Sequence, residues 1–202
     1  MDAYVCPKSV VPDKLYRVHY PGSRTTFASS EGFSASDTSK VYSNDKLSDF
    51  KQDIVNQFTW SCRKSLPFIS LFSDREHAEN WGCKEPWHGH QDDGWSLYVI
   101  DATRLKDTNR LFKLSDLLEE LNLQIPAPAG RQIHGAYLCL HHIPVEAIIE
   151  KKSPSEVKAG KYEQRFAEGV NSDYLEEYSG SEREAMQENY NTIFEKNIEN
   201  NW

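Results

Sequence analysis

The sequence has no long apolar run and no surplus of positive charge, and each absence excludes a class of function. No segment approaches the ~20 consecutive apolar residues that a membrane-spanning helix needs, and residues 1–8 contain no apolar core typical of a secretory signal. Lys and Arg number 23 against 31 Asp and Glu, which gives a formal net charge of −8. Nucleic-acid and anionic-membrane binders need excess Lys and Arg to contact phosphates. We therefore expect a cytoplasmic protein that binds neither nucleic acid nor membranes.

Closely spaced cysteine pairs are also missing. The four cysteines, Cys6, Cys62, Cys83 and Cys139, lie far apart and form no CxxC motif. This spacing is typical of reduced thiols in an intracellular protein and does not suggest a disulfide framework.

The sequence does contain enough apolar material for one core. Its 202 residues are 38% hydrophobic and 12% aromatic, which suits one domain or one domain with an appended element. We predict an N-terminal lead over 1–14, a domain over 15–152 and a charged C-terminal helical extension over 153–202. The extension is expected either to pack on the domain or to serve as an arm that binds a partner.

We expect an α+β fold with a two-sheet β-core, and residue periodicity predicts where its strands and helices lie. Alternating and β-rich segments predict strands over 15–20, 67–72, 95–105 and 135–143, and we expect 145–150 to pair with the last of these. Apolar stripes predict helices over 47–58, 73–82 and 115–121. Ser73 and Glu76 match a capping box, and Gly82 is expected to end that helix. Residues 22–45 are predicted to be a long loop with one short strand or turn.

A pair of polar side chains marks the first strand. Arg17 and His19 share one face because side chains alternate along a strand. Arginine can hold a phosphate through forked hydrogen bonds, and His19 could bond a ribose hydroxyl. This pattern indicates a site for a phosphorylated, nucleotide-like ligand. The alternative is a solvent-facing strand with two polar residues.

Two further segments carry candidate site residues. Ser70 lies near the end of an apolar strand, where its hydroxyl could orient a ribose or simply be tolerated. Gln132 and His134 lie on one side of the chain if that segment is extended, directly before the strand 135–143. We expect the residue nearest the reacting centre there, and the alternative is loop polarity beside a glycine turn.

Metal and nucleophile sites have weaker support. Cys83, His88 and His90 could bind a metal, as in a metal hydrolase, but their spacing is not that of a zinc finger, and a polar loop is the favoured interpretation. We predict no metal. Cys139 and His141 share a strand face, but no third residue completes a catalytic triad.

Three ordered segments together resemble ADP-ribosyltransferase-like domains, and in particular an uncharacterised fungal domain family of that fold. They are Leu15-Tyr-Arg-Val-His, then Phe68-Ile-Ser-Leu-Phe-Ser with Glu76-His77-Ala78, and Ile143-Pro-Val-Glu-Ala-Ile-Ile149. The resemblance covers about residues 14–150. It implies a split, mostly antiparallel β-core with NAD in the cleft. Toxin, effector, immunity and self-recognition roles all fit it equally.

The resemblance also implies residue roles. Arg17 would be the first-motif arginine that contacts NAD, and Ser70 the second-motif serine. The third motif usually supplies a glutamate, but here the sequence reads Arg131-Gln132-Ile133-His134-Gly135. Gln132 would then act on the ribose hydroxyl, and His19 and His134 would help to bind NAD. Trp81, Trp87 or Tyr98 could stack on nicotinamide.

The missing glutamate leaves three possibilities open. NAD would be a substrate of an ADP-ribosyltransferase with a protein acceptor, or of an NAD glycohydrolase. Alternatively, the domain is a catalytically inactive interaction module, and the C-terminal helices bind a protein partner.

Overall fold

The computed structural model describes residues 2–59, 61–84, 94–105, 110–133 and 135–170. Its contacts divide the chain into two units, 1–154 and 155–202. The first unit contains both sheets, and the second contains most of helix α4 (Pro154–Val170). None of the helices within the described ranges is long and apolar enough to cross a membrane.

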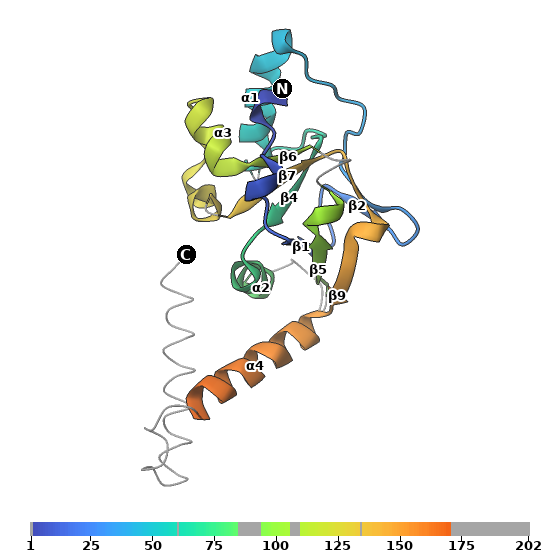
Figure 1. Ribbon diagram of the computed structural model, residues 1–202, viewed down its shortest axis with the longest axis vertical. Helices are drawn as coiled ribbons and strands as arrows, with labels where there is room; N and C mark the ends of the chain where they lie inside the picture. Colours follow the sequence, from blue (N-terminus) through green and yellow to red (C-terminus); the bar gives the residue numbers. More distant parts are fainter. Residues whose placement is uncertain (1, 60, 85–93, 106–109, 134, 171–202) are drawn as a thin grey trace. The chain divides into compact units, whose positions relative to one another are not determined.

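Helices and strands alternate irregularly along the first unit (Figure 1). The α-helices are α1 (Leu47–Gln57), α2 (Arg75–Lys84) and α3 (Leu114–Glu120). Short 3-10 helices cover Asp2–Tyr4, Lys8–Val10, Asn44–Lys46, Ala102–Arg104, Ala127–Gln132 and Val145–Ala147. The strands are β1 (Lys14–His19), β2 (Thr26–Ala28), β3 (Gly32–Ser34), β4 (Phe68–Phe72), β5 (Ser96–Asp101), β6 (Leu111–Lys113), β7 (Ala136–Leu140), β8 (His142–Pro144) and β9 (Ile148–Lys152).

The strands form two sheets. One has six strands in the order β6-β7-β4-β1-β5-β9, and the other has three in the order β2-β3-β8. All of the described pairings are antiparallel. The α+β class and antiparallel core predicted from the sequence are confirmed.

Strand β1 is held differently on its two sides. It pairs with β5 along its whole length, from Lys14 opposite Asp101 to His19 opposite Ser96. In the described residues its pairing with β4 is limited to Tyr16 opposite Phe72. The six-stranded sheet is therefore opened between β1 and β4 beyond this one pair.

The two faces of the six-stranded sheet bury separate apolar clusters. One cluster joins this sheet to the three-stranded sheet and includes Leu15, Phe33, Ile69, Tyr98 and Ile143. The other lies under α1 and α3, which cover the β6-β7-β4 part of the sheet in Figure 1. Its members include fully buried aromatic side chains from a helix and two strands: Phe50, Phe68 and Phe112.

The predicted strand 135–143 is wrong in its continuity. The chain forms β7 in the larger sheet and β8 in the smaller one, with only His141 between them. His141 has a φ of 65°, which is uncommon for a residue with a side chain and turns the backbone. The expected pairing of 145–150 with this strand is also wrong. The 3-10 helix Val145–Ala147 carries the chain to the far edge of the larger sheet, where β9 pairs with β5.

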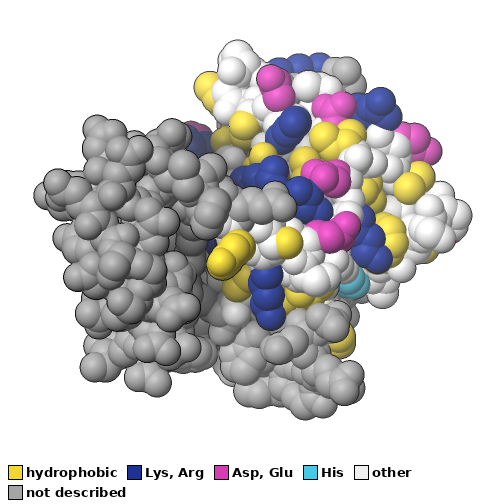
Figure 2. Space-filling model, turned by 90° about the horizontal axis from the view of Figure 1, so that it is seen from below, with side chains coloured by type: hydrophobic (Ala, Val, Ile, Leu, Met, Phe, Trp, Pro, Cys, Tyr) yellow, Lys and Arg dark blue, Asp and Glu magenta, His cyan; other side chains and the backbone are white. Residues whose placement is uncertain are grey.

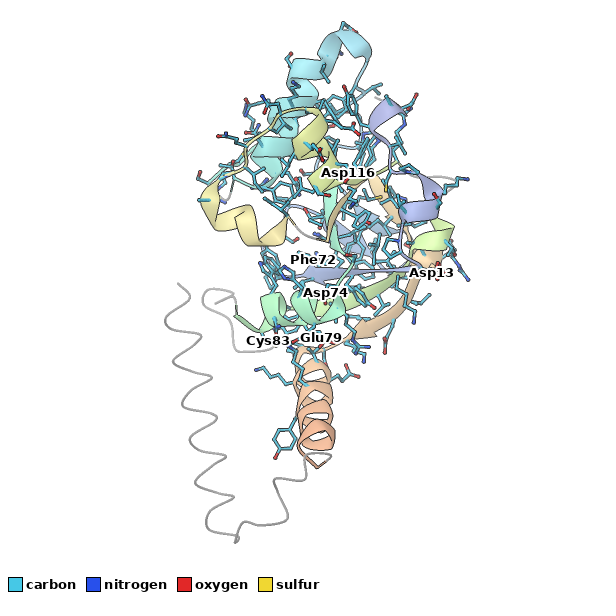
Figure 3. The ribbon with its side chains drawn as sticks, turned by 60° about the vertical axis from the view of Figure 1, so that its left-hand side comes forward. Asp13, Phe72, Asp74, Glu79, Cys83 and Asp116 are labelled. Atoms are coloured by element: carbon cyan, nitrogen blue, oxygen red, sulfur yellow. The ribbon has the colours of Figure 1, made fainter. Side chains whose placement is uncertain are left out.

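Helix α2 differs from its prediction at both ends. Ser73 does not form the expected capping box, because its backbone N–H donates to the Gly135 carbonyl at 2.7 Å. Asp74 caps the helix instead, with its Oδ1 accepting from the His77 N–H at 3.1 Å. Figure 3 shows Phe72 and Asp74 where β4 leads into α2. The helix continues past Gly82 to Lys84. Gly82 lies against the Trp95 ring, where no Cβ would fit, so this glycine is explained by packing and does not mark a helix end.

The expected loop 22–45 contains two strands, one more than predicted. Strands β2 and β3 form a hairpin, and β3 pairs with β8. Gly32 begins β3 with a φ of 102°, and a Cβ there would collide with the β8 backbone. Only glycine satisfies both requirements, so this position fixes where the hairpin meets β8.

Candidate functional site

Arg17 projects into the opening between β1 and β4. Its Nη1 donates to the Ser70 carbonyl at 2.7 Å, and its Nη2 donates to the hydroxyls of Ser23 at 3.1 Å and Thr25 at 2.5 Å. The side chain thus bonds to a strand carbonyl at a position where the two strands no longer pair. We call the group Arg17, Ser23, Thr25, Gln57 and Ser70 the polar seam.

Among the residues that the structure describes, the charge of Arg17 has no acidic partner. The residue is only 7% exposed, and no carboxylate in the described ranges pairs with it. Its Nε is buried and has no hydrogen-bond partner among the described residues. Burial lowers the pKa of Arg17 to about 10, so the guanidinium still carries its charge at pH 7. Buried cations are normally paired.

His19 lies one position further along the same face, in an aromatic cluster. Its ring centroid is 5.4 Å from that of Phe33 and 6.4 Å from those of Phe27 and Tyr98. Burial, with the positive charges of Arg17 and Lys151, lowers the pKa of His19 to about 4. The ring is therefore neutral at pH 7. Its Nδ1 is buried with no hydrogen-bond partner among the residues described.

Phe33 connects the two sequence-predicted residues of β1. The Arg17 guanidinium carbon lies 5.6 Å from the Phe33 ring centroid, which is a cation–π distance. The structure thus brings Arg17 and His19 together, as the strand alternation predicted.

Ser70 uses its two oxygens in different directions. Its carbonyl accepts from Arg17, whereas its hydroxyl accepts from Gln57 Nε2 at 2.9 Å. In β4 Ser70 pairs with Leu138, a member of the apolar cluster under α1. The hydroxyl is therefore on the α1 side, and the structure joins Ser70 to Arg17 through its carbonyl.

Arg24 ties the loop that follows β1 to the end of α1. Its Nη1 donates to the Asn56 carbonyl at 3.2 Å, and its Nη2 donates to the Thr59 carbonyl at 2.9 Å. A cation is favourable at the carboxyl end of a helix. This contact places Ser23 and Thr25, on either side of Arg24, against Arg17.

Sequence reasoning missed Gln57, Ser23 and Thr25. A signal for Gln57 was present, because it lies seven residues after Phe50 and three after Ile54, on the buried face of α1. A polar residue on an apolar helical stripe indicates a buried hydrogen bond. Ser23 and Thr25 had no comparable signal, since the loop 22–45 is rich in Ser and Thr throughout.

Several other candidates fall partly or wholly outside the description. Gln132 ends the 3-10 helix Ala127–Gln132, but its side chain is not among those described, and His134 lies outside the described residues. Trp87, His88 and His90 also lie outside them. The described residues contain no group of three or more His, Cys, Asp or Glu placed to bind a metal.

The Cys139–His141 pair does not form a catalytic arrangement. Cys139 is fully buried, and burial raises the pKa of its thiol to about 12. Its Sγ donates to the His142 carbonyl at 3.4 Å, whereas His141 Nε2 bonds to the Lys40 carbonyl at 2.8 Å. A protonated thiol with these partners is unsuited to nucleophilic attack.

The aromatic candidates occupy different surroundings. Tyr98 is buried in the cluster around His19, with its ring centroid 4.8 Å from that of Phe33. Trp81 packs against Tyr20 and Phe72 from helix α2. Tyr98 therefore shares the cluster around His19, and Trp81 contacts Tyr20 beyond the end of β1.

The surface near β7 and β8 is also hollowed. A pocket of about 600 Å³ is lined by Lys40, Val41, Tyr42, Arg110, Leu140, His141, His142 and Pro144. Its two cations are already paired, Lys40 with Asp53 at 2.5 Å and Arg110 with Asp2 at 3.0 Å. Figure 2 shows Lys and Arg side chains interspersed with Asp and Glu on one face of the molecule.

Comparisons with known proteins extend this description. The model of a family described as a domain of unknown function, DUF7587, matches residues 10–157. No curated protein matches the chain significantly. Ten chains of solved structures do match, among them EcPltA, with 15% identity and a TM-score of 0.47 over 70% of this chain and 75% of that chain. At those values the likeness carries no conclusion about function.

Proposed function

The chain belongs to the DUF7587 family, and from the site within its matched segment we propose that the domain binds NAD and cleaves the nicotinamide–ribose bond. In this proposal it is an ADP-ribosyltransferase-like enzyme, either a transferase or an NAD glycohydrolase. The observation that carries the proposal is the buried, charged Arg17, which has no carboxylate partner in the described residues.

A phosphorylated ligand would supply the negative charge that Arg17 lacks among its described partners. Burying a cation without an anion is costly, and the neutral oxygens of Ser70, Ser23 and Thr25 compensate only part of the cost. The pyrophosphate of NAD carries negative charge and acceptor oxygens that suit a guanidinium fork. Two of the groups that bond to Arg17 are the hydroxyls of Ser23 and Thr25, which can rotate to make room for a phosphate.

The other residues have roles consistent with this ligand. His19 and Ser70 would hold the ribose on the nicotinamide side, Gln132 would act on its hydroxyl, and His134 would contribute to NAD binding. His19 is neutral at pH 7, so it adds no second charge and its Nδ1 can take part in a hydrogen bond.

In the reaction, the bond between ribose carbon and nicotinamide nitrogen breaks, and its electron pair leaves with neutral nicotinamide. The ribose carbon, which becomes cation-like, then bonds to water in a glycohydrolase or to a protein acceptor in a transferase, and that nucleophile loses a proton. Positioning and electrostatic stabilisation would supply the acceleration.

One observation favours a second candidate function, a catalytically inactive module that binds a protein partner. Arg17 already makes three hydrogen bonds to protein oxygens, so it also has the contacts expected of a structural residue. Together with the absence of the usual third-motif glutamate from 131–135, this supports binding without turnover.

The test is incubation of the purified chain with etheno-NAD, whose fluorescence rises when nicotinamide leaves. We compare the wild type with Arg17→Met, which keeps side-chain length and removes the charge, and with the exposed Arg63→Gln as a matched control. We expect cleavage by the wild type and Arg63→Gln and a loss of about 10- to 100-fold in Arg17→Met, since a charge-assisted hydrogen bond contributes about 1.5–3 kcal/mol.

Circular dichroism establishes that each variant is folded. Cleavage that survives unchanged in a folded Arg17→Met variant would contradict the proposal. NAD that raises the melting temperature of the wild type without being cleaved would instead support the inactive module.

A further inference from the structure

We propose that Gln57 is a positioning residue of this site, which fixes the Ser70 hydroxyl as a hydrogen-bond donor to a ribose oxygen of the ligand. The inference rests on the proposed function, because it takes the ligand to be NAD at Arg17 and Ser70. It adds a residue that the sequence motifs did not include, and it assigns a direction to one hydrogen bond of the site.

The direction follows from the chemistry of the two groups. An amide nitrogen only donates, whereas a serine hydroxyl has one proton to donate and lone pairs that accept. Gln57 Nε2 donates to Ser70 Oγ at 2.9 Å, so the serine oxygen is the acceptor in this bond. The serine proton is then left for another acceptor, and within the described ranges no protein atom takes it.

Helix α1 holds the Gln57 amide in place. Gln57 lies in the last turn of the helix, one turn after Ile54 and two after Phe50, both fully buried. Arg24 bonds to the carbonyls of Asn56 and Thr59 on either side of this turn. These contacts fix the backbone that carries Gln57, and the amide Oε1 is buried with no hydrogen-bond partner among the described residues.

The same serine is in contact with the phosphate-binding candidate. Its carbonyl accepts from Arg17 Nη1 at 2.7 Å while its hydroxyl is bonded to Gln57. Ser70 is half-buried and is not sealed in the core. In the proposal, Arg17 holds the phosphates, and the Ser70 hydroxyl, on the α1 side of β4, donates to a ribose oxygen of the same ligand.

Isothermal titration with NAD tests the inference in four variants: Gln57→Met, Ser70→Ala, the double variant and Ser70→Thr. We expect affinity to fall about tenfold in Ser70→Ala, which loses one hydrogen bond, and about threefold to tenfold in Gln57→Met. The double variant should be no weaker than Ser70→Ala alone, because Gln57 acts only through Ser70. Ser70→Thr keeps the hydroxyl and should retain affinity.

Inorganic pyrophosphate is the control ligand, and all four variants should bind it as the wild type does. A purely structural role for Gln57 would weaken both ligands alike and would overturn the inference. Losses that add in the double variant, or an unchanged NAD affinity in Gln57→Met, would also overturn it.

Different results would contradict the proposed function itself. If the wild type does not bind NAD, or if Arg17→Met binds it equally well, both the function and this inference are wrong. NAD binding that needs Arg17 but is indifferent to Gln57 leaves the function standing and removes only the inference. The side-chain amide signals of Gln57 in nuclear magnetic resonance spectra should shift in Ser70→Ala without any ligand, and unshifted signals would refute the hydrogen bond itself.

Discussion

The two sides of strand β1 are held to the sheet by different means. Toward β5, the strand forms a backbone ladder along all six of its residues. Toward β4, the described pairing is confined to Tyr16 and Phe72, and the Arg17 side chain bonds to the Ser70 carbonyl. The side toward β4 holds a buried cation that is bonded only to neutral oxygens among the described residues.

We expect the apolar cluster between the two sheets to carry far more of the stability than the polar seam. Leu15 is fully buried between the two sheets, so Leu15→Ala should lower the free energy of unfolding by about 2–5 kcal/mol through lost apolar contact and a residual cavity. Urea denaturation measures this loss. Val41→Ala, at a side chain that is 67% exposed, is the control and should change it little. Equal effects of the two substitutions would refute the assignment.

Arg17→Met tests the side of β1 that faces β4. The substitution removes three hydrogen bonds and also the desolvation cost of the cation, so these two effects largely offset each other. We expect the free energy of unfolding to change by only about 1 kcal/mol, measured by the same urea denaturation. A loss as large as that of Leu15→Ala would show that the guanidinium is needed to hold β1 and β4 together.

The smallest effect is expected from His19, and it depends on pH. The folded pKa of about 4 lies below the ordinary value of 6.5, so the unfolded chain binds a proton more readily. The contribution of the neutral ring is therefore complete above pH 6.5 and is lost as the pH falls toward 4. The ring is only half-buried, which keeps this effect small.

Melting temperatures at pH 7 and pH 5 measure this dependence. The decrease at pH 5 should be smaller in His19→Gln than in the wild type, because the variant lacks the titrating ring. An identical decrease in wild type and His19→Gln would show that His19 does not titrate in this range.

The sequence predicted the elements whose pattern is local. Strand β1, helix α1 and strand β4 all have regular apolar spacing, and their bounds differ from the structure by one residue or less. The placement of Arg17 and His19 on one face of β1 followed from strand alternation alone. These features depend only on neighbours along the chain.

The errors arose where distant contacts decide the outcome. Gly82 has the local signature of a helix end, but its missing side chain makes room for the Trp95 ring and the helix continues. The pairing of β9 with β5 joins segments that are far apart in sequence, and the hydrogen bond from Gln57 to Ser70 depends on how α1 packs against β4. Tertiary packing decides such contacts, and the local apolar pattern does not specify it.

The passage of the chain from β7 to β8 has a consequence for how this unit unfolds. Only His141 separates the two strands, and its backbone also bonds to residues on either side, with its N–H donating to Pro67 and its carbonyl accepting from Ala35. Neither sheet can come apart without drawing the same few residues out of the other. A destabilised variant of this unit is therefore expected to melt cooperatively, and chaperones and proteases would meet it as wholly folded or wholly unfolded.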